Sequence, residues 1–347
     1  MLTLSFDKNQ DYKILNRSEC IKYTYLGRTG LKVSRLCLGT MNFGNYNDEK
    51  ESFKIMDAAL DAGINFFDTA NNYGKSTHNE GITETIMGKW FAQGGGRRER
   101  VILATKVHEE MGDKNDGPNS ASGLSLYKIR RHLDASMRRL QTNHLEIYYM
   151  HHIDRNVTWD EIWEAFQPLV QQGRVDYVAS SNFGGWNIAM AQAEAKARHI
   201  LGLVCEQHRY SLLCRLPELE LLPAAKAHGL GVVAWSPLQQ GLLSRNALAH
   251  TNVSRTAELK TEFEKVRNQL EAFSKLCKEI GEYEDVVALA WLLANPVITA
   301  PIIGPRILEH FASSMKALDL VLDAGVMKKL DNIFPGPGGM APEAYAW

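Results

Sequence analysis

64-INFFD-68, 101-VILATK-106 and 145-LEIYYMH-151 are three short apolar, β-branched or aromatic runs, and each ends on a polar residue. Runs of this length and composition predict buried β-strands. Asp68, Lys106 and His151 lie at the ends of these strands, and Tyr73 follows in the loop after Asp68. If the strands are parallel and form a barrel, polar residues at their exits meet on one rim, where such folds build active sites.

Strand-like runs alternate with amphipathic segments along most of the chain. The other predicted strands are 35-RLCLGT-40, 175-VDYVASS-181, 203-LVCEQ-207, 231-GVVAWS-236 and 298-ITAPIIG-304. Strict alternation of strands and helices predicts parallel strands joined by helical crossovers. Eight such units favour a (β/α)8 TIM barrel. A Rossmann fold is disfavoured, because no GxGxxG motif follows the first strand.

Capping residues and glycines predict where several helices begin and end. Asp48, Ser125 and Thr158 are expected N-caps of helices that run to about Ala62, Leu140 and Gln172, and another helix is expected near 80–92. The stretch 22-KYTYLGRTGLKVS-34 predicts a short β-hairpin. We interpret 1–22 as an extension, 23–347 as one domain, 244–282 as an insertion after the seventh strand and 335–347 as an irregular tail.

Composition excludes several classes of function. The chain has 347 residues, 45% of them hydrophobic, and a formal net charge of −1, which gives no electrostatic reason to expect a nucleic acid or membrane surface as partner. No apolar run reaches the ~18 residues of a spanning helix. The start lacks the pattern of a signal peptide, so we expect a cytoplasmic protein. Five cysteines without a CxxC motif indicate free thiols, with Cys37 and Cys205 buried.

The four polar residues together indicate proton donation to a substrate. Tyrosine has a solution pKa near ~10, and a nearby ammonium such as that of Lys106 eases release of its proton. Asp68 would compensate the charge of a buried Lys106, and His151 would orient a substrate oxygen. With no metal or nucleophile motif, this chemistry fits carbonyl reduction with hydride from a nicotinamide cofactor.

Each of these residues also has an ordinary structural explanation. Asp68 alone could cap a helix, Lys106 could be solvated, and His151 could pack on the rim. His151 and His152 make a poor metal pair, because adjacent strand residues point to opposite faces, so we expect no metal. The combination of all four residues is what favours a catalytic site.

Eight motifs in order make the chain resemble an aldo-keto reductase of bacterial type, with a more distant similarity to potassium-channel β subunits. They are 26-LGRTGLKVSRLCLGTMNFG-44, 67-FDTANNYG-74, 104-ATKV-107, 146-EIYYMHHID-154, 180-SSNF-183, 207-QHRYSLL-213, 234-AWSPLQQGLL-243 and 302-IIGPR-306. The resemblance implies that Tyr73 is the general acid, assisted by Lys106 and Asp68, while His151 positions the carbonyl.

The resemblance also implies that NADPH is the cofactor. Ser181, Asn182 and Gln207 would hold the nicotinamide carboxamide, and Trp235 would stack on its ring. The pyrophosphate would lie on the backbone N–H groups of the loop after Trp235. Arg306 would grip the 2′-phosphate and favour NADPH over NADH. The remaining implied contacts are Thr40, Met41, Asp68, Ser236, Pro237, Leu238, Gly241, Gly304, His310 and Ser314.

One departure from the family pattern lies at the adenosine end. Family members often carry Gln and then Glu-Asn at the positions of His310, Ser313 and Ser314, so the carboxylate at 313 is absent here. Substrate contacts are expected from the rim loops and the tail. The candidates are Phe43, Tyr46, His152, Tyr345 and Trp347.

Three functions stay open at this point. The first is NADPH-dependent reduction of an aldehyde or ketone, including a sugar-like carbonyl. The second is reduction of a conjugated C=C bond in a nucleotide-linked keto-deoxysugar, which would use the same four residues. The third is a regulatory, NADPH-binding subunit; channel β subunits typically carry Asn at the position of His151, which favours a reductase. A homo-oligomer is compatible with all three.

Overall fold

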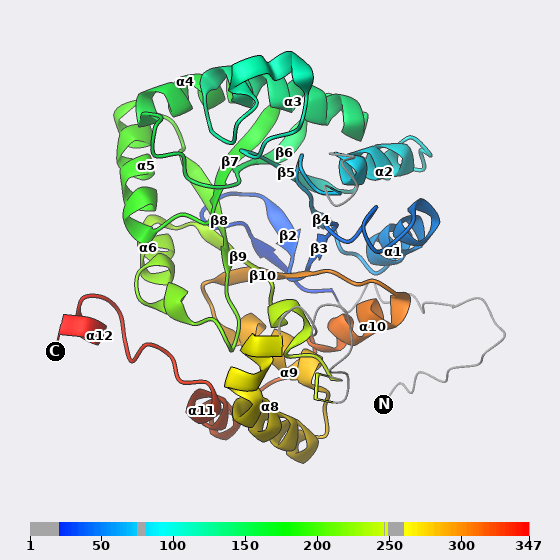
Figure 1. Cartoon of the computed structure of the whole chain (residues 1–347), viewed down its shortest axis with the longest axis vertical. Coiled ribbons are helices and arrows are strands. Elements are labelled where there is room, and N and C mark those ends of the chain that lie inside the picture. Colours follow the sequence, from blue (N-terminus) through cyan, green and yellow to red (C-terminus); the bar gives the residue numbers. More distant parts are fainter. Residues whose placement is uncertain (1–20, 75–80, 246, 249–259, 347) are drawn as a thin grey trace.

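The strands form a closed eight-stranded barrel surrounded by helices (Figure 1). The computed structural model describes residues 21–74, 81–245, 247–248 and 260–346. Neighbouring strands are parallel throughout the barrel, in the order β10-β3-β4-β5-β6-β7-β8-β9. The strands are β3 (Cys37–Gly39), β4 (Phe66–Asp68), β5 (Ile102–Val107), β6 (Leu145–Met150), β7 (Val175–Ser181), β8 (Leu203–Arg209), β9 (Gly231–Trp235) and β10 (Ile298–Ile303). The predicted (β/α)8 barrel is confirmed.

A helix follows each barrel strand and packs on the outside of the barrel. These helices are α1 (Glu49–Asp61), α2 (Ile82–Phe91), α3 (Leu126–Leu140), α4 (Trp159–Gln171), α5 (Gly185–Ala197), α6 (Leu221–His228), α9 (Glu284–Ala294) and α10 (Leu308–Lys316). The predicted helix starts are confirmed: Asp48, Ser125 and Thr158 each accept a backbone N–H of the first turn.

The remaining elements lie outside this regular alternation. The predicted insertion after the seventh barrel strand contains α8 (Lys260–Ile280), and α11 (Ala324–Ile333) packs beside it. Short 3-10 helices are η2 (Lys114–Asn119), η3 (Leu216–Glu218) and η4 (Gln239–Gly241). The tail was expected to be irregular, but it ends in α12 (Glu343–Ala346), and Ala341 N–H donates to the Leu219 carbonyl at 2.8 Å. None of the helices in the described ranges is long and apolar enough to span a membrane.

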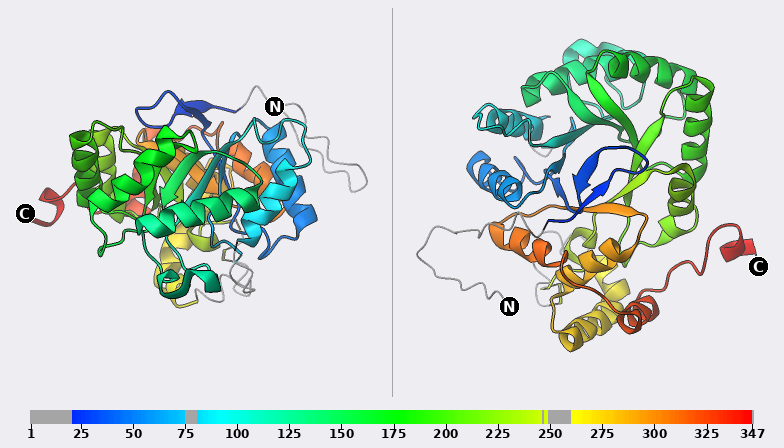
Figure 2. Two further views of the ribbon diagram at one scale, coloured as in Figure 1. Left: turned by 90° about the horizontal axis from the view of Figure 1, so that it is seen from above. Right: turned by 180° about the vertical axis from the view of Figure 1, so that it is seen from behind.

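The predicted N-terminal hairpin closes one end of the barrel (Figure 2). β1 (Tyr23–Tyr25) and β2 (Lys32–Ser34) pair antiparallel. Leu26 and Val33 are fully buried and join the core inside the barrel. Arg28 donates to the carbonyls of His228 and Leu201, both at 2.5 Å. The hairpin therefore seals the end where the strands begin and leaves the opposite rim for a site.

Two hydrophobic cores hold the fold together. The larger one fills the space between the barrel and its helices, and the smaller one fills the barrel itself. Ile21, which we assigned to the extension, is buried in the larger core, and Lys22 donates to the Leu318 carbonyl at 2.6 Å. The barrel domain thus includes the last two residues of the predicted extension; residues 1–20 are outside the described ranges.

Gly88 sets the spacing between α2 and α3. A Cβ atom at Gly88 would lie 2.0 Å from the carbonyl oxygen of Arg139, which is backbone and cannot move aside. We expect Gly88→Ala to lower the free energy of unfolding by about 2 kcal/mol or more, because overpacking forces the helices apart. Gly30→Ala is the control, since nothing lies within 4 Å of its Cβ position. Urea unfolding measures both; equal stability of the two variants would contradict this packing.

Candidate active site

The four predicted catalytic residues meet at the C-terminal rim of the barrel. Asp68 ends β4, Lys106 lies near the end of β5, and His151 directly follows β6. Tyr73 lies in the turn after β4, and its N–H donates to the Ala70 carbonyl at 3.2 Å. The parallel pairing of β4, β5 and β6 brings these strand ends side by side.

Lys106 is the centre of the group. Its Nζ donates to Asp68 Oδ2 at 2.6 Å, to the Thr69 carbonyl at 2.7 Å and to the Tyr73 hydroxyl at 3.1 Å. The Lys106 side chain is fully buried. An ammonium has three N–H donors, so all of them have an acceptor.

Asp68 is fixed through both carboxylate oxygens and through its backbone. Gln207 Nε2 donates to Oδ1 at 2.8 Å, while Lys106 occupies Oδ2. The N–H and the hydroxyl of Thr40 both donate to the Asp68 carbonyl, at 3.0 and 2.9 Å. Gln207 therefore holds the Asp68 carboxylate and Thr40 holds the Asp68 backbone, and both are predicted cofactor contacts.

Burial and charge act in opposite directions on the pKa of Lys106. Burial lowers this pKa, but the charge of Asp68 and the hydrogen bonds to Asp68 and Tyr73 raise it above its ordinary value. Burial raises the pKa of Tyr73, and Lys106 lowers it only in part. We expected Lys106 to ease release of the Tyr73 proton; its effect on the pKa has that direction but is smaller than the effect of burial. Tyr73 is thus a neutral hydroxyl at neutral pH.

His151 lies beside Tyr73 as a neutral imidazole. The two ring centroids are 6.0 Å apart at an interplanar angle of 75°. Burial, reinforced by the charge of Lys106, holds the pKa of His151 well below its usual value. Its Nδ1 is buried and has no hydrogen-bond partner among the described residues. In those ranges no three His, Cys, Asp or Glu side chains are arranged to hold a metal.

Asn182, Ser181 and Trp235 form a hydrogen-bonded group on the other side of the rim. Trp235 Nε1 donates to Asn182 Oδ1 at 3.1 Å, and Asn182 Nδ2 donates to the His151 carbonyl at 3.0 Å. The Ser181 hydroxyl donates to the Gln207 carbonyl at 2.8 Å. The Trp235 ring is therefore fixed in orientation and half-buried, as a stacking surface for a flat ring requires.

The loop after β9 forms more hydrogen bonds within itself than the sequence suggested. Ser236, Gln239, Gln240 and Gly241 have positive φ values of 54°, 48°, 56° and 100°. The N–H groups from Gln239 to Leu243 all donate within the loop, to Ser236, Leu238 or Gln239. Of the residues that we expected to hold a pyrophosphate through N–H groups, Gly241 thus already uses its N–H within the turn. Pro237 is buried, and Leu238 is half-buried.

At the corner of the rim where we expected the adenosine end of the cofactor, Arg306 lies over the Tyr46 ring, 3.8 Å from its centroid. The buried amides of Asn42 and Asn47 hold the loop before Arg306: Nδ2 of Asn42 donates to the Gly304 carbonyl at 2.8 Å and Nδ2 of Asn47 to the Arg306 carbonyl at 2.5 Å. The Oδ1 atoms of both amides are buried without partners among the described residues. A polar ligand is thus compatible with this corner.

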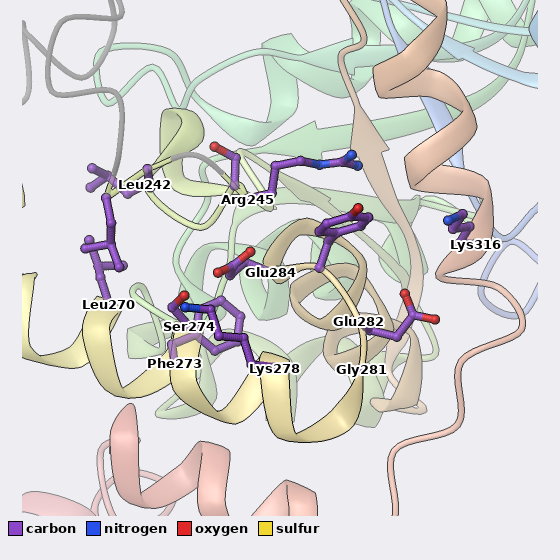
Figure 3. Close-up of a pocket in the computed structure, with 14 residues that line it drawn as sticks. Leu242, Arg245, Leu270, Phe273, Ser274, Lys278, Gly281, Glu282, Glu284 and Lys316 are labelled. Carbon is purple, nitrogen blue, oxygen red and sulfur yellow. The ribbon is translucent and has the colours of Figure 1, made fainter. Parts of the chain in front are cut away.

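A carboxylate is present near position 313 after all, but it comes from α9. Asp285 Oδ2 accepts the Ser313 hydroxyl, and the Arg245 guanidinium bonds both residues. Arg245 also edges a pocket of about 600 Å³, in which Leu270, Phe273 and Ser274 line the side of α8 and Lys316 lies on α10 (Figure 3). The Ser314 hydroxyl donates to the His310 carbonyl at 2.9 Å, inside its own helix.

The residues that we expected to contact the substrate differ in how far they are exposed. Phe43 is fully buried in the outer core, so it has no surface to offer a substrate, and its selection as a contact was wrong. Met41 and Tyr46 are 45% and 49% exposed. His152 stacks on His151 with ring centroids 5.0 Å apart. Trp347 is outside the described residues, and the side chain of Tyr345 is not described either.

Sequence reasoning missed the residues that support the site from behind. Asn71 Nδ2 lies 3.2 Å from His132 Nδ1, and His132 Nε2 lies 3.1 Å from Asp116 Oδ2. This buried chain connects the turn of Tyr73 to α3 and to the loop after β5. Asn71 lies within the motif 67-FDTANNYG-74, but His132 and Asp116, like Arg245 and Asp285, lie outside the quoted motifs, so no local signal could have identified them.

Comparisons with known proteins identify the family. A model of the Aldo/keto reductase family matches residues 35–334. The chain is 63% identical over 327 residues to "Uncharacterized oxidoreductase YrpG" of Bacillus subtilis (strain 168), covering 94% of this chain and 100% of that protein. It is 33% identical to a "Putative voltage-gated potassium channel subunit beta" of Schizosaccharomyces pombe, covering 90% and 93%. It is also 29% identical to "Norsolorinic acid reductase A" of Aspergillus parasiticus, covering 88% and 79%. The chain belongs to the aldo/keto reductase family.

The Lys106–Asp68 pair generates a prediction about stability. Lys106→Met leaves a buried carboxylate without its cation, and we expect the free energy of unfolding to fall by about 3–5 kcal/mol at neutral pH. Burial raises the pKa of Asp68, so the unpaired Asp68 carboxylate of the variant becomes protonated as the pH falls. The loss of unfolding free energy relative to the wild type should therefore be smaller at about pH 5 than at about pH 7. Urea unfolding at both pH values measures this.

The matched control is the double variant Lys106→Met with Asp68→Asn, which removes both charges. We expect it to regain most of the lost stability. A single variant as stable as the wild type at both pH values would show that the two groups are not a charged pair.

Proposed function

We propose that this aldo/keto reductase family member reduces an aldehyde or ketone to an alcohol with NADPH. The observation that carries the proposal is the hydrogen bond of 3.1 Å between a fully buried Lys106 ammonium and the Tyr73 hydroxyl. It provides a proton donor whose conjugate base is stabilised by a fixed cation. The oxidoreductase name of the Bacillus subtilis relative supports the same class of reaction.

In the proposed mechanism, NADPH held at the rim would supply the hydride that the carbonyl carbon accepts. The Tyr73 hydroxyl gives its proton to the carbonyl oxygen, which yields the alcohol and a phenolate. Lys106 stabilises the phenolate, and Asp68 keeps Lys106 charged and oriented. His151 donates a hydrogen bond that holds the carbonyl oxygen near Tyr73. Tyr73 then regains a proton from solvent, so no other oxidant or reductant is required.

The residues for holding the cofactor lie on the opposite half of the rim. Trp235 offers a fixed aromatic face for the nicotinamide ring, and Ser181, Asn182 and Gln207 offer polar groups beside it. Arg306 supplies a cation for the 2′-phosphate. Further contacts proposed for the cofactor are Met41, Ser236, Pro237, Leu238, Gly241, Gly304 and His310.

The raised pKa of Tyr73 favours reduction at neutral pH. A proton donor must be protonated before the reaction, and burial keeps the Tyr73 hydroxyl neutral. Oxidation of an alcohol needs the phenolate instead, so its rate increases only as the pH rises towards the pKa of Tyr73. Reduction is therefore the direction that this site supports under neutral conditions.

A regulatory role is the second candidate, favoured by the relatives named as potassium channel β subunits. A subunit of this kind would bind NADPH and turn it over little. His151 favours catalysis, because a neutral imidazole beside Tyr73 provides an N–H donor and a fixed ring surface that orient a carbonyl group. Turnover of a simple aldehyde separates the two candidates.

Cofactor binding tests the proposal independently of turnover. We expect NADPH to quench tryptophan fluorescence at micromolar concentration. Arg306→Ala should raise the Kd of NADPH by about 10-fold or more, because a bidentate pair with the phosphate is lost. NADH binding should change much less. Arg130→Ala, at an exposed arginine of α3, is the control. Absence of nicotinamide binding by the wild type would refute the proposed function, and equal losses for both cofactors would refute the role of Arg306.

Loss of the Tyr73 hydroxyl tests the mechanism. We expect Tyr73→Phe to lower kcat by about 10²-fold or more, because general acid catalysis is removed, while the Kd of NADPH stays within about 3-fold since the ring remains. Tyr127→Phe, at an exposed tyrosine, is the control. Steady-state reduction of an aldehyde panel measures kcat. Wild-type activity in Tyr73→Phe would remove Tyr73 from the mechanism.

A further inference from the structure

Three histidines and one glutamate form a continuous cluster next to the catalytic residues. His152 stacks on His151, and the His108 ring meets His152 edge-on with centroids 5.4 Å apart. Glu109 Oε1 lies 3.1 Å from His108 Nδ1 and 3.6 Å from His152 Nε2. These residues directly follow β5 and β6, and His152 contacts both Glu109 and the ring of His151.

Glu109 is an ionised group in this position. Its hydrogen bond with His108, the charge of His108 and the hydrogen bond from the Ser122 hydroxyl, at 3.1 Å, outweigh burial and lower its pKa to about 2. The Glu109 side chain is 26% exposed, and it has no lysine or arginine within ion-pair distance in the described part of the chain. Burial lowers the pKa of His152, which is therefore neutral at neutral pH.

The other charges near the substrate side are compensated or directed elsewhere. Lys106 and Asp68 neutralise each other within the catalytic group. Lys128 donates to the carbonyls of Ser120 and Ala121, and Arg155 lies over the Trp186 ring, 5.8 Å from its centroid. Glu109, which has no bonded lysine or arginine among the described residues, is thus a negative charge that a substrate in front of His151 would meet close to the His152 ring.

We propose that Glu109 makes this a site for uncharged carbonyl substrates and disfavours carbonyl compounds that carry a carboxylate or phosphate group. The proposal rests on the proposed reductase function and adds the class of substrate. A negative charge brought within about 8 Å of Glu109 costs on the order of tenfold in kcat/KM at a surface-like dielectric and moderate salt. Among the functions considered, a nucleotide-linked sugar with its diphosphate falls on the disfavoured side.

Two aldehydes of nearly the same shape test this. Methyl 4-formylbenzoate is neutral, and 4-carboxybenzaldehyde is an anion at neutral pH. We expect the wild type to prefer the neutral aldehyde by about 10-fold or more in kcat/KM and Glu109→Gln to reduce that preference by about 10-fold, since Gln keeps the hydrogen bonds without the charge. Raising the salt concentration from about 0.01 M to about 0.5 M should reduce the preference of the wild type for the neutral aldehyde in kcat/KM and leave the preference of the variant unchanged.

The control is Glu279→Gln, which makes the same charge change on the exposed surface of α8, where Glu279 pairs with Lys329. It should leave the ratio of the two aldehydes unchanged. A wild-type enzyme without preference for the neutral aldehyde, or an unchanged ratio in Glu109→Gln, would overturn the proposal.

A binding measurement separates this proposal from the proposed function. Calorimetry compares benzamide with benzoate in the presence of NADP⁺, where no turnover occurs. If neither aldehyde is reduced, the reductase function fails. Even then, a higher affinity for benzoate relative to benzamide in Glu109→Gln than in the wild type still supports selection against anions. Equal binding of the two ligands by the wild type and the variant overturns it.

Discussion

A full positive charge on Lys106, with none of its side chain exposed, is the constraint on which the rest of the site depends. An isolated ammonium in a barrel would lose its proton, because burial disfavours the charged form. Asp68 prevents this by supplying the opposite charge at 2.6 Å, and Gln207 and Thr40 hold Asp68 in turn. The position of the Tyr73 hydroxyl follows from the third N–H bond of the same ammonium.

The barrel provides the precision that this charge requires. β4, β5 and β6 are adjacent parallel strands, so their ends differ in height only by the register of their pairing. The N-terminal hairpin seals the opposite end with Leu26 and Val33. Polar side chains can therefore stay dry behind the rim while the rim itself faces a ligand. Catalysis by a buried tyrosine depends on this separation, because water would screen the interaction between the ammonium and the phenolate.

The two halves of the rim have different electrostatic character. Arg209 ends β8, and Arg245 and Arg306 follow β9 and β10, on the side where we propose that the cofactor and its phosphates are held. Glu109 lies on the side of β5 and β6, close to the carbonyl position. A phosphate-rich cofactor and an uncharged substrate would thus each meet a suitable half, and His151 lies near the boundary between them.

Local sequence determined the strands, the capped helix starts and the four polar residues of the candidate site, because each depends on a short pattern: an apolar run, an N-cap or a polar strand end. Closure of the barrel follows from eight repeated units. Only the tertiary structure decided that Phe43 is buried, that the loop after β9 uses its own N–H groups and that Asp285 approaches Ser313 from another helix. These features depend on contacts between segments far apart in the chain, and the energy of such contacts leaves no periodic signal in either segment.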